Sequence, residues 1–76
     1  MSVLLMRYVA MDLMTKYIIK ESDSLMEIQD IARRYKYDMW EKKNFYHSTD
    51  VKIFDKYKQK DRIKLQKIIK FDWLED

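Results

Sequence analysis

The chain has 76 residues, of which 16 are basic and 13 acidic, and it contains no glycine, no proline and no cysteine. A chain this short forms one domain and buries only about 60% of its unfolded surface, so marginal stability is expected. Without cysteine it builds no disulfide or thiolate metal site, and without glycine it lacks the loops that cradle phosphates. Its single histidine, His47, has no second imidazole with which to bind zinc. We therefore expect no metal and no other cofactor.

Residues 3–14 form an apolar run that Arg7 and Asp12 interrupt. The spacing fits a helix or a strand, and a helix is favoured. The charges within the run, and the lack of a small-residue cleavage site after it, argue against a membrane span and an export signal. We expect residues 1–16 to form an N-terminal extension packed on the folded body.

The next segment predicts a strand followed by a helix. Residues 16–20, KYIIK, are aromatic and β-branched, which is typical of a short strand. Ser24 followed by Glu27 predicts a helix start, in which the serine oxygen accepts from a first-turn N–H and the glutamate returns to the serine N–H. Apolar side chains then recur every three or four residues up to Tyr35, so we expect the helix to end near Lys36.

The second half of the chain is predicted in three pieces. Residues 38–45 predict a second, shorter helix, for which Asn44 is the best left-handed stop. Residues 51–57 predict one or two further helical turns, and the alternation in residues 66–73 predicts a strand. The order of strand, two helices, a basic segment and a strand predicts a small α+β domain. The alternative is an all-α helical bundle, which the lack of glycine and proline would suit.

The stretch YIIKESDSLMEIQDIARRY resembles the opening of a LysM module. The residues that match the family pattern are Tyr17, Ile19, Asp23, Ser24, Leu25, Ile31, Ala32 and Tyr35. Near the C-terminus, LQKIIKF is similar to the closing strand of the family through Gln66 and Lys67. Ser22 and Leu65 stand where the family has glycine.

The resemblance implies a βααβ fold over residues 17–71, with residues 72–76 as an acidic tail. In LysM modules a shallow groove binds N-acetylglucosamine chains of peptidoglycan or chitin, which would make Ser22, Asp23 and Ser24 the glycan-binding loop. A Cβ at the glycine position hinders close approach of the backbone to a sugar. The resemblance therefore points to the other use of such modules, as structural pieces of contractile phage tails and baseplates of the tail protein X type.

The first functional hypothesis is a non-enzymatic structural or interaction module in a phage-type tail or baseplate hub, located in the virion or the cytoplasm. Its partners would be other protein subunits of the assembly, with no membrane attachment. A peptidoglycan-binding module is the alternative within the same fold. His47, Ser48 and Asp50 include the residue types of a catalytic site, but neighbours in sequence rarely converge on one point, so no enzyme activity is expected.

Residues 52–70 carry eight basic side chains against Asp55 and Asp61, a net charge of +6. The basic residues are Lys52, Lys56, Lys58, Lys60, Arg62, Lys64, Lys67 and Lys70. Such a segment is typical of contact with an acidic partner. Nucleic acid ranks last among the candidate partners, and it would suit a small all-α nucleic-acid-binding or regulatory protein. Seven lysines to one arginine favour nonspecific contact.

Aromatic side chains are dense in the middle of the chain, and a domain of this size cannot easily bury all of them. Tyr35 and Trp40 are predicted to lie in the core. Tyr37, Tyr46 and Trp73 are predicted to lie at a protein interface, because aromatic side chains supply much of the binding energy there.

Overall fold

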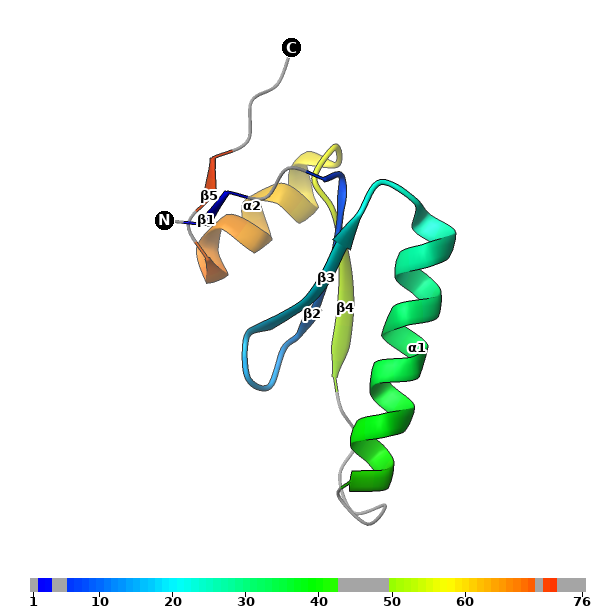
Figure 1. The fold of residues 1–76 in the computed structure, drawn as a ribbon. Coiled ribbons are helices and arrows are strands. Elements are labelled where there is room, and N and C mark those ends of the chain that lie inside the picture. Colours follow the sequence, from blue (N-terminus) through cyan, green and yellow to red (C-terminus); the bar gives the residue numbers. More distant parts are fainter. Residues whose placement is uncertain (1, 4–5, 43–49, 70, 73–76) are drawn as a thin grey trace.

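The computed structural model of the chain describes residues 2–3, 6–42, 50–69 and 71–72. Their elements follow in the order β1 (Ser2–Val3), β2 (Tyr8–Asp12), β3 (Tyr17–Ser22), α1 (Leu25–Lys42), β4 (Val51–Asp55), α2 (Gln59–Ile68) and β5 (Phe71–Asp72) (Figure 1). The fold is therefore α+β, as predicted, and the all-α alternative is wrong.

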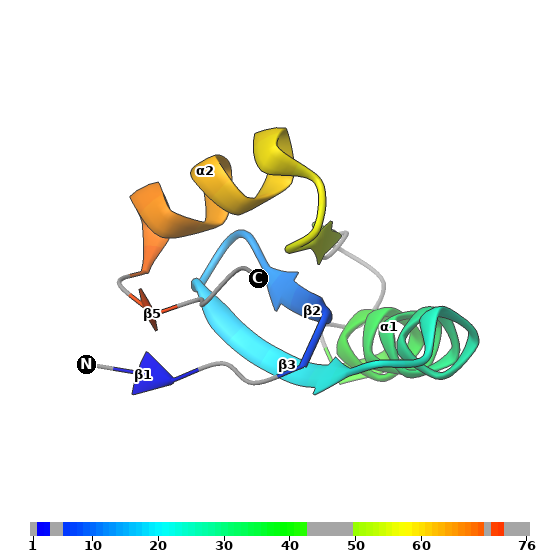
Figure 2. The same ribbon diagram turned by 90° about the horizontal axis from the view of Figure 1, so that it is seen from above.

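Three strands form an antiparallel sheet in the order β3, β2, β4, so β2 lies in the centre. Seen from above in Figure 2, α1 and α2 lie on opposite sides of this sheet. The short strands β1 and β5 pair in parallel and bring the two ends of the described chain together. The result is a three-layer arrangement of helix, sheet and helix.

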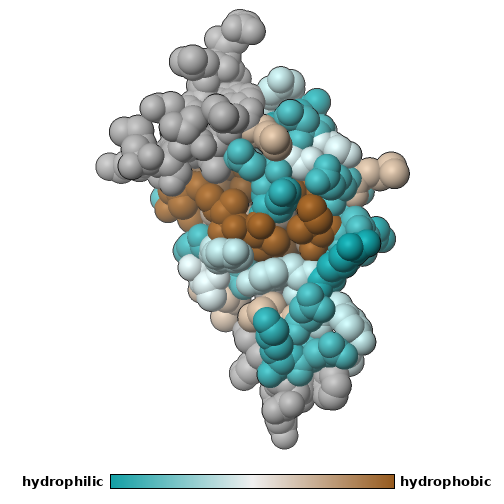
Figure 3. Space-filling view, in the orientation of Figure 1, coloured by the Kyte–Doolittle hydropathy of each residue, from teal (hydrophilic) through white to brown (hydrophobic). Residues whose placement is uncertain are grey.

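The core consists of two apolar clusters, one on each face of the sheet. The buried members under α2 are Val9, Met11, Phe54 and Leu65. The buried members under α1 are Ala10, Ile28 and Ala32. Figure 3 shows that some apolar side chains between the two helices also reach the surface, as a brown band across the middle of the molecule.

The central strand corrects the prediction for residues 3–14. Val9, Ala10 and Met11 are all fully buried, because α1 covers one face of β2 and α2 covers the other. A strand covered on both faces has a continuous apolar sequence and loses the alternation that marks a half-buried strand. The predicted helix in this segment is therefore wrong.

The boundaries of the helices also differ from the prediction. Helix α1 continues to Lys42, so its predicted end near Lys36 is wrong, and residues 38–42 belong to the same helix. Its outer side is supported by pairs one turn apart: the Tyr37 hydroxyl donates to Glu41 at 3.1 Å, and similar pairs join Asp30 to the arginines that follow it. The sequence predicted helix for residues 38–45 as well, so the error is the break placed near Lys36, which α1 does not contain.

The third part of the chain is a strand followed by a helix. The helix predicted over residues 51–57 is wrong, because residues 51–55 form β4. The strand predicted over residues 66–73 is wrong up to Ile68, because Gln59–Ile68 is α2; among the described residues of this stretch, Phe71–Asp72 pairs as a strand. Leu65 is the one buried residue of α2 in the described chain, so the apolar side of this helix leaves almost no sequence pattern.

The predicted strand and helix start around Ser24 are confirmed. The N–H of Glu27 donates to the Ser24 hydroxyl at 3.3 Å, which is the expected cap. The other half of the cap passes through Ser22, whose hydroxyl donates to Glu27 and accepts from the Ser24 N–H, both at 3.0 Å. The Ser22 hydroxyl therefore stabilises the turn before α1, and the turn needs no glycine.

The β2–β3 hairpin turns at Lys16, whose φ of 65° lies in the left-handed region. A side chain with a Cβ is strained there, whereas glycine is not. We expect Lys16→Gly to raise the free energy of unfolding by about 0.5–1 kcal/mol in urea titrations. Lys20→Gly, in the extended part of β3, is the matched control and should lower it. Equal losses in both variants would contradict the strain at Lys16.

Candidate functional site

Strand β4 lies at an edge of the sheet, because it pairs with β2 on one side only. The N–H of Leu13 donates to the carbonyl of Asp50 at 2.7 Å, so the backbone of Asp50 faces β2. In an antiparallel ladder, successive residues direct their backbone groups to alternate sides. The N–H and C=O groups that face outward therefore belong to Val51, Ile53 and Asp55.

This edge is closed at one end and open along the rest. The N–H of Asp55 donates to the Asp61 carboxylate of α2 at 3.2 Å, and its carbonyl accepts from the Lys58 N–H at 3.0 Å. No residue in the described part of the chain bonds to the outward backbone groups of Val51 and Ile53. Two residues of β4 therefore remain able to pair with another strand.

A hollow of about 450 Å³ lies beside the open edge, between β4 and α1. Its lining residues are Gln29, Ala32, Arg33, Lys36, Val51 and Ile53. The floor is apolar, because Val51 and Ile53 pack into the cluster that contains Ala32. Arg33 and Lys36 are exposed, and none of the described lining residues carries a carboxylate. The site is thus a short hydrogen-bonding edge beside an apolar floor with a basic wall.

The opposite edge of the sheet, β3, is less regular. The β2–β3 register shifts between Ala10 and Met11, which leaves Ile19 as an extra residue in β3. A bulge of this kind twists the strand and interrupts the row of outward backbone groups, as proteins commonly do to protect an edge. Of the two edges of this sheet, β4 is the more regular one.

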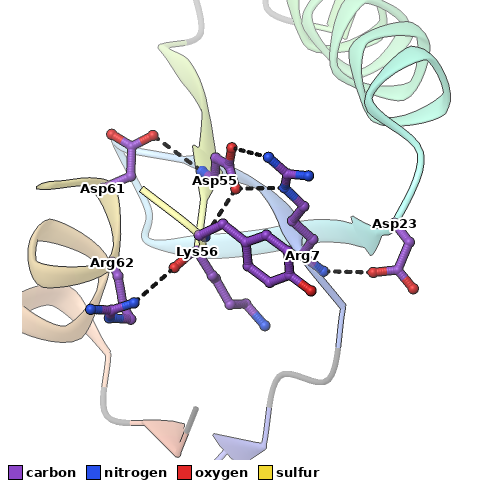
Figure 4. A network of polar contacts seen from close by, with 7 residues as sticks. Arg7, Asp23, Asp55, Lys56, Asp61 and Arg62 are labelled. Atoms are coloured by element: carbon purple, nitrogen blue, oxygen red, sulfur yellow. Dashed lines mark hydrogen bonds and ion pairs between the residues drawn. The ribbon is translucent and has the colours of Figure 1, made fainter. Parts of the chain in front are cut away.

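The closed end of β4 is held by the ion pair of Asp55 with Arg7 (Figure 4). The guanidinium Nε and Nη2 donate to the two carboxylate oxygens at 2.9 and 3.0 Å, and the Tyr57 N–H donates to the same carboxylate at 3.0 Å. The hydrogen bonds from Arg7 are the main cause of a lowered pKa of Asp55. The guanidinium also lies 4.9 Å from the ring centre of Tyr8 and 4.5 Å from that of Tyr57.

The same junction connects four segments of the fold (Figure 4). The N–H of Arg7 donates to the Asp23 carboxylate at 2.8 Å, just before α1. The N–H of Lys56 donates to the Arg7 carbonyl at 3.0 Å, and Arg62 of α2 donates to the Lys56 carbonyl at 3.2 Å. The beginnings of β2, α1 and α2 are therefore tied to the end of β4.

The Lys56 side chain is fully buried at this junction, with an exposed fraction of 0%. Its ammonium lies 3.9 Å from the Glu21 carboxylate. Burial lowers the pKa of Lys56 to about 8, against the opposing effect of Glu21. Lys56 was predicted to belong to a basic surface, but it lies in the interior and presents no charge to a partner.

The predicted glycan loop has a structural role in the cap of α1. Ser22 is buried and its hydroxyl bridges Glu27 and Ser24, while Asp23 accepts from Arg7. A hollow of about 340 Å³ beside the loop is lined by Met6, Lys20, Glu21, Ser22, Asp23, Ser24 and Glu27. Most polar groups of the loop are thus already used within the fold.

The predicted basic residues do not share one surface. A hollow of about 420 Å³ lies on the exposed side of α2, and its lining residues are Gln59, Lys60, Ile63, Lys64 and Lys67. Lys58 is exposed just before this helix, whereas the ammonium of Lys52 lies over the ring of Phe54, 5.3 Å from its centre. Lys70 lies outside the described residues.

The aromatic residues are placed as follows. Tyr37 is 56% exposed, and its ring lies 6.0 Å from that of Trp40, which is 42% exposed. The prediction that Trp40 lies in the core is therefore wrong, because α1 directs this part of its surface away from the sheet. Tyr35 is half-buried, and Tyr46 and Trp73 lie outside the described residues.

The remaining candidates are a catalytic site, a metal site and a membrane-spanning helix. His47 and Ser48 lie outside the described residues, and Asp50 is exposed. Within the described ranges, no three histidine, aspartate or glutamate side chains come together as a metal site would need. Neither described helix has the length and apolar character needed to cross a bilayer.

The open edge of β4 is the feature that the sequence analysis missed. The spacing within residues 51–57 fits a helix, and this concealed the β-branched alternation of Val51 and Ile53, which is typical of a strand. No protein family, curated protein or solved structure matches this chain. Its function is therefore inferred from its own geometry.

Proposed function

We propose that the chain is a non-enzymatic protein-interaction module that binds an extended segment of a partner protein along the outer edge of β4. The observation that carries the proposal is the row of outward backbone groups at Val51 and Ile53, which no described residue satisfies. In strand addition of this kind, main-chain hydrogen bonds supply affinity and neighbouring pockets supply selectivity. The hollow between β4 and α1 is such a pocket.

The arrangement of the edge supports this use. Asp61 and Lys58 satisfy the outward groups of Asp55, so an incoming strand has a defined stop at that end. The bulge at Ile19 makes the other edge a poorer template. The regular edge is also the one beside a hollow, so backbone pairing and side-chain recognition are available together.

The resemblance to LysM modules, and a place in a phage-type tail or baseplate, stay predictions. The strand β3, the Ser24 cap and the start of α1 support the resemblance. In the described chain, however, one helix separates β3 from β4, where the βααβ pattern has two. A structural role in an assembly agrees with strand addition, because neighbouring subunits would supply the extended segment.

Peptidoglycan binding has less support than strand addition. It would require the backbone near Ser22 and Asp23 to face a sugar, while both side chains already serve the start of α1 and the Arg7 junction. A hollow is present there, but three carboxylate side chains, those of Glu21, Asp23 and Glu27, line it.

The test uses synthetic versions of the chain and a displayed library of linear peptides of about a dozen residues. Enriched peptides are titrated against the isotope-labelled chain and followed by nuclear magnetic resonance. We expect the amide signals of Val51 and Ile53 to shift and their hydrogen exchange to slow. A methyl group on the nitrogen of Ile53 removes the outward donor and keeps the side chain, and we expect it to weaken binding by about tenfold or more.

N-methylation of Ile18 is the matched control. Ile18 lies opposite Met11, whose backbone faces β4, so the Ile18 N–H also faces outward, but on the bulged edge. This version should bind the peptides like the unmodified chain, and circular dichroism should show the same fold for both. Equal binding by the Ile53 version, or signal changes confined to other surfaces, would overturn the proposal.

Nonspecific nucleic-acid binding by α2 is the second candidate function. The exposed Lys60, Lys64 and Lys67 lie together on this helix and could contact successive phosphates. Mixed-sequence DNA in the same titration would then shift signals of α2, with strong salt dependence, and leave those of Val51 and Ile53 in place.

A further inference from the structure

The hollow beside β4 has a charge as well as a shape. Arg33 is 78% exposed, and its ion pair with Asp30 is long, at 3.7 Å. An exposed pair of this kind contributes little, so Arg33 remains available to a ligand. No described carboxylate lies within ion-pair distance of Lys36. The wall of the hollow therefore offers two cations that an incoming chain can neutralise.

The position of these cations sets the pattern of the ligand. In Figure 1, α1 runs downward to Lys42 while β4 runs upward, so Lys36, one turn beyond Ala32, lies toward the end at which β4 begins. A ligand side chain that meets Lys36 therefore lies nearer to Val51 than to Ile53, and one beside Ile53 lies over the apolar floor. Residues two apart in a strand share a face. The ligand would thus present an acidic and an apolar side chain, two residues apart, toward α1.

A second copy of the chain is a poor occupant of this edge. Two β4 strands paired about a twofold axis would place both α1 helices on the same face of the joined sheet. Arg33 and Lys36 of each copy would then approach those of the other, and each chain already has a net charge of +3. Like charges brought together oppose association.

We infer that the occupant of the β4 edge is an acidic, extended segment of a different protein, held through its backbone by Val51 and Ile53 and through its carboxylates by Arg33 and Lys36. This inference rests on the proposed strand addition and adds the chemistry of the partner. The charge complementarity of the hollow carries it, since the apolar floor alone would accept any extended apolar chain.

The experiment reverses one charge at a time. Peptides enriched on the unmodified chain are expected to contain an acidic residue two positions from an apolar one. Lys36→Glu should weaken their binding by about tenfold or more, and replacing the acidic residue of the peptide with lysine should restore binding to that variant. Raising the salt from about 0.05 M to about 0.5 M should weaken the native pair. Arg34→Glu makes the same charge change on an α1 residue that does not line the hollow, and it should have little effect.

Three results would overturn the inference, each in a distinguishable way. If peptides without acidic residues shift Val51 and Ile53, and Lys36→Glu binds them equally, strand addition stands and the acidic partner is wrong. If no peptide contacts the β4 edge, both proposals are wrong. If sedimentation shows a dimer that N-methylation of Ile53 dissociates, the occupant is a second copy of the chain.

Discussion

Replacing Asp55 with alanine is expected to lower the free energy of unfolding by about 2–3 kcal/mol. The carboxylate accepts three hydrogen bonds, two from Arg7 and one from the Tyr57 N–H, and its side chain is only 10% exposed. Removing it leaves a half-buried guanidinium and a backbone donor without their acceptor. For a chain of this length, the thermal midpoint should fall by roughly 10–20 °C.

Asp38→Ala, on the exposed side of α1, is the matched control for Asp55→Ala and should change stability by less than about 0.5 kcal/mol. The two variants should also differ in acid. The pKa of Asp55 is lower in the folded state than its unfolded value of 3.8, so the ionised carboxylate stabilises the fold at pH values above 3.8. This stabilisation is lost as the pH falls through the folded-state pKa. Asp55→Ala should lose this part of the acid dependence. A small loss of stability for Asp55→Ala would mean that the pair behaves as a surface ion pair.

Stability is expected to rise as the pH increases from about 8 to about 10, because of Lys56. Its folded pKa is about 8 and its unfolded value 10.5. Below pH 8 the folded state holds a buried ammonium, which costs free energy. As the pH rises, the folded chain releases this proton before the unfolded chain does, and the cost disappears. The full shift corresponds to about 3 kcal/mol. Urea unfolding at a series of pH values measures it.

The increase in stability with pH should end near pH 10, because the unfolded chain then begins to ionise at Tyr35. Its hydroxyl donates to the buried Asp12 at 2.9 Å, and burial with this bond raises the pKa of Tyr35 from 10 to about 12. The neutral tyrosine is thus favoured in the folded state, and its contribution is lost between pH 10 and 12 as the unfolded form ionises first. Stability should therefore pass through a maximum near pH 10.

Lys56→Met separates this effect from other titrations, since it keeps an unbranched side chain one atom shorter and removes the charge. The variant should lose the rise in stability between pH 8 and 10, because it has no ammonium at this position to release a proton. The Glu21 side chain is 26% exposed overall, but its Oε2 is buried and lies 3.9 Å from the Lys56 ammonium, so removing the ammonium leaves this oxygen in the interior without its opposing charge and should lower stability at neutral pH. Lys58→Met, at an exposed position, should keep the rise. A rise that persists in Lys56→Met would assign it to another group.

Local signals predicted the part of the fold that depends on neighbours in sequence. The β-branched run of β3 and the Ser24–Glu27 cap act over a few residues, and both appear in the structure. The buried centre of the sheet was not predictable in this way, because β2 is apolar on both faces only as a result of α1 and α2. Tertiary cover therefore removed the pattern that would have identified the strand.

The candidate site was hidden for a related reason. Val51 and Phe54 are three residues apart and suit one side of a helix, while Val51 and Ile53 suit one side of a strand. Pairing with β2 decides between them, and β2 is more than thirty residues away in the sequence. An open edge is a property of strand order, which no local pattern contains. The basic side chains of α1 indicate a binding site only because the fold places β4 beside them.

The strand order also has a kinetic consequence. The β2–β3 hairpin closes over a few residues, whereas β4 reaches β2 only after the whole of α1, so pairing of β4 requires the longer loop closure. Contacts on β4 should therefore form late in folding. A ligand bound along its outer edge would then prolong the lifetime of the folded state by slowing unfolding, and would leave the folding rate nearly unchanged.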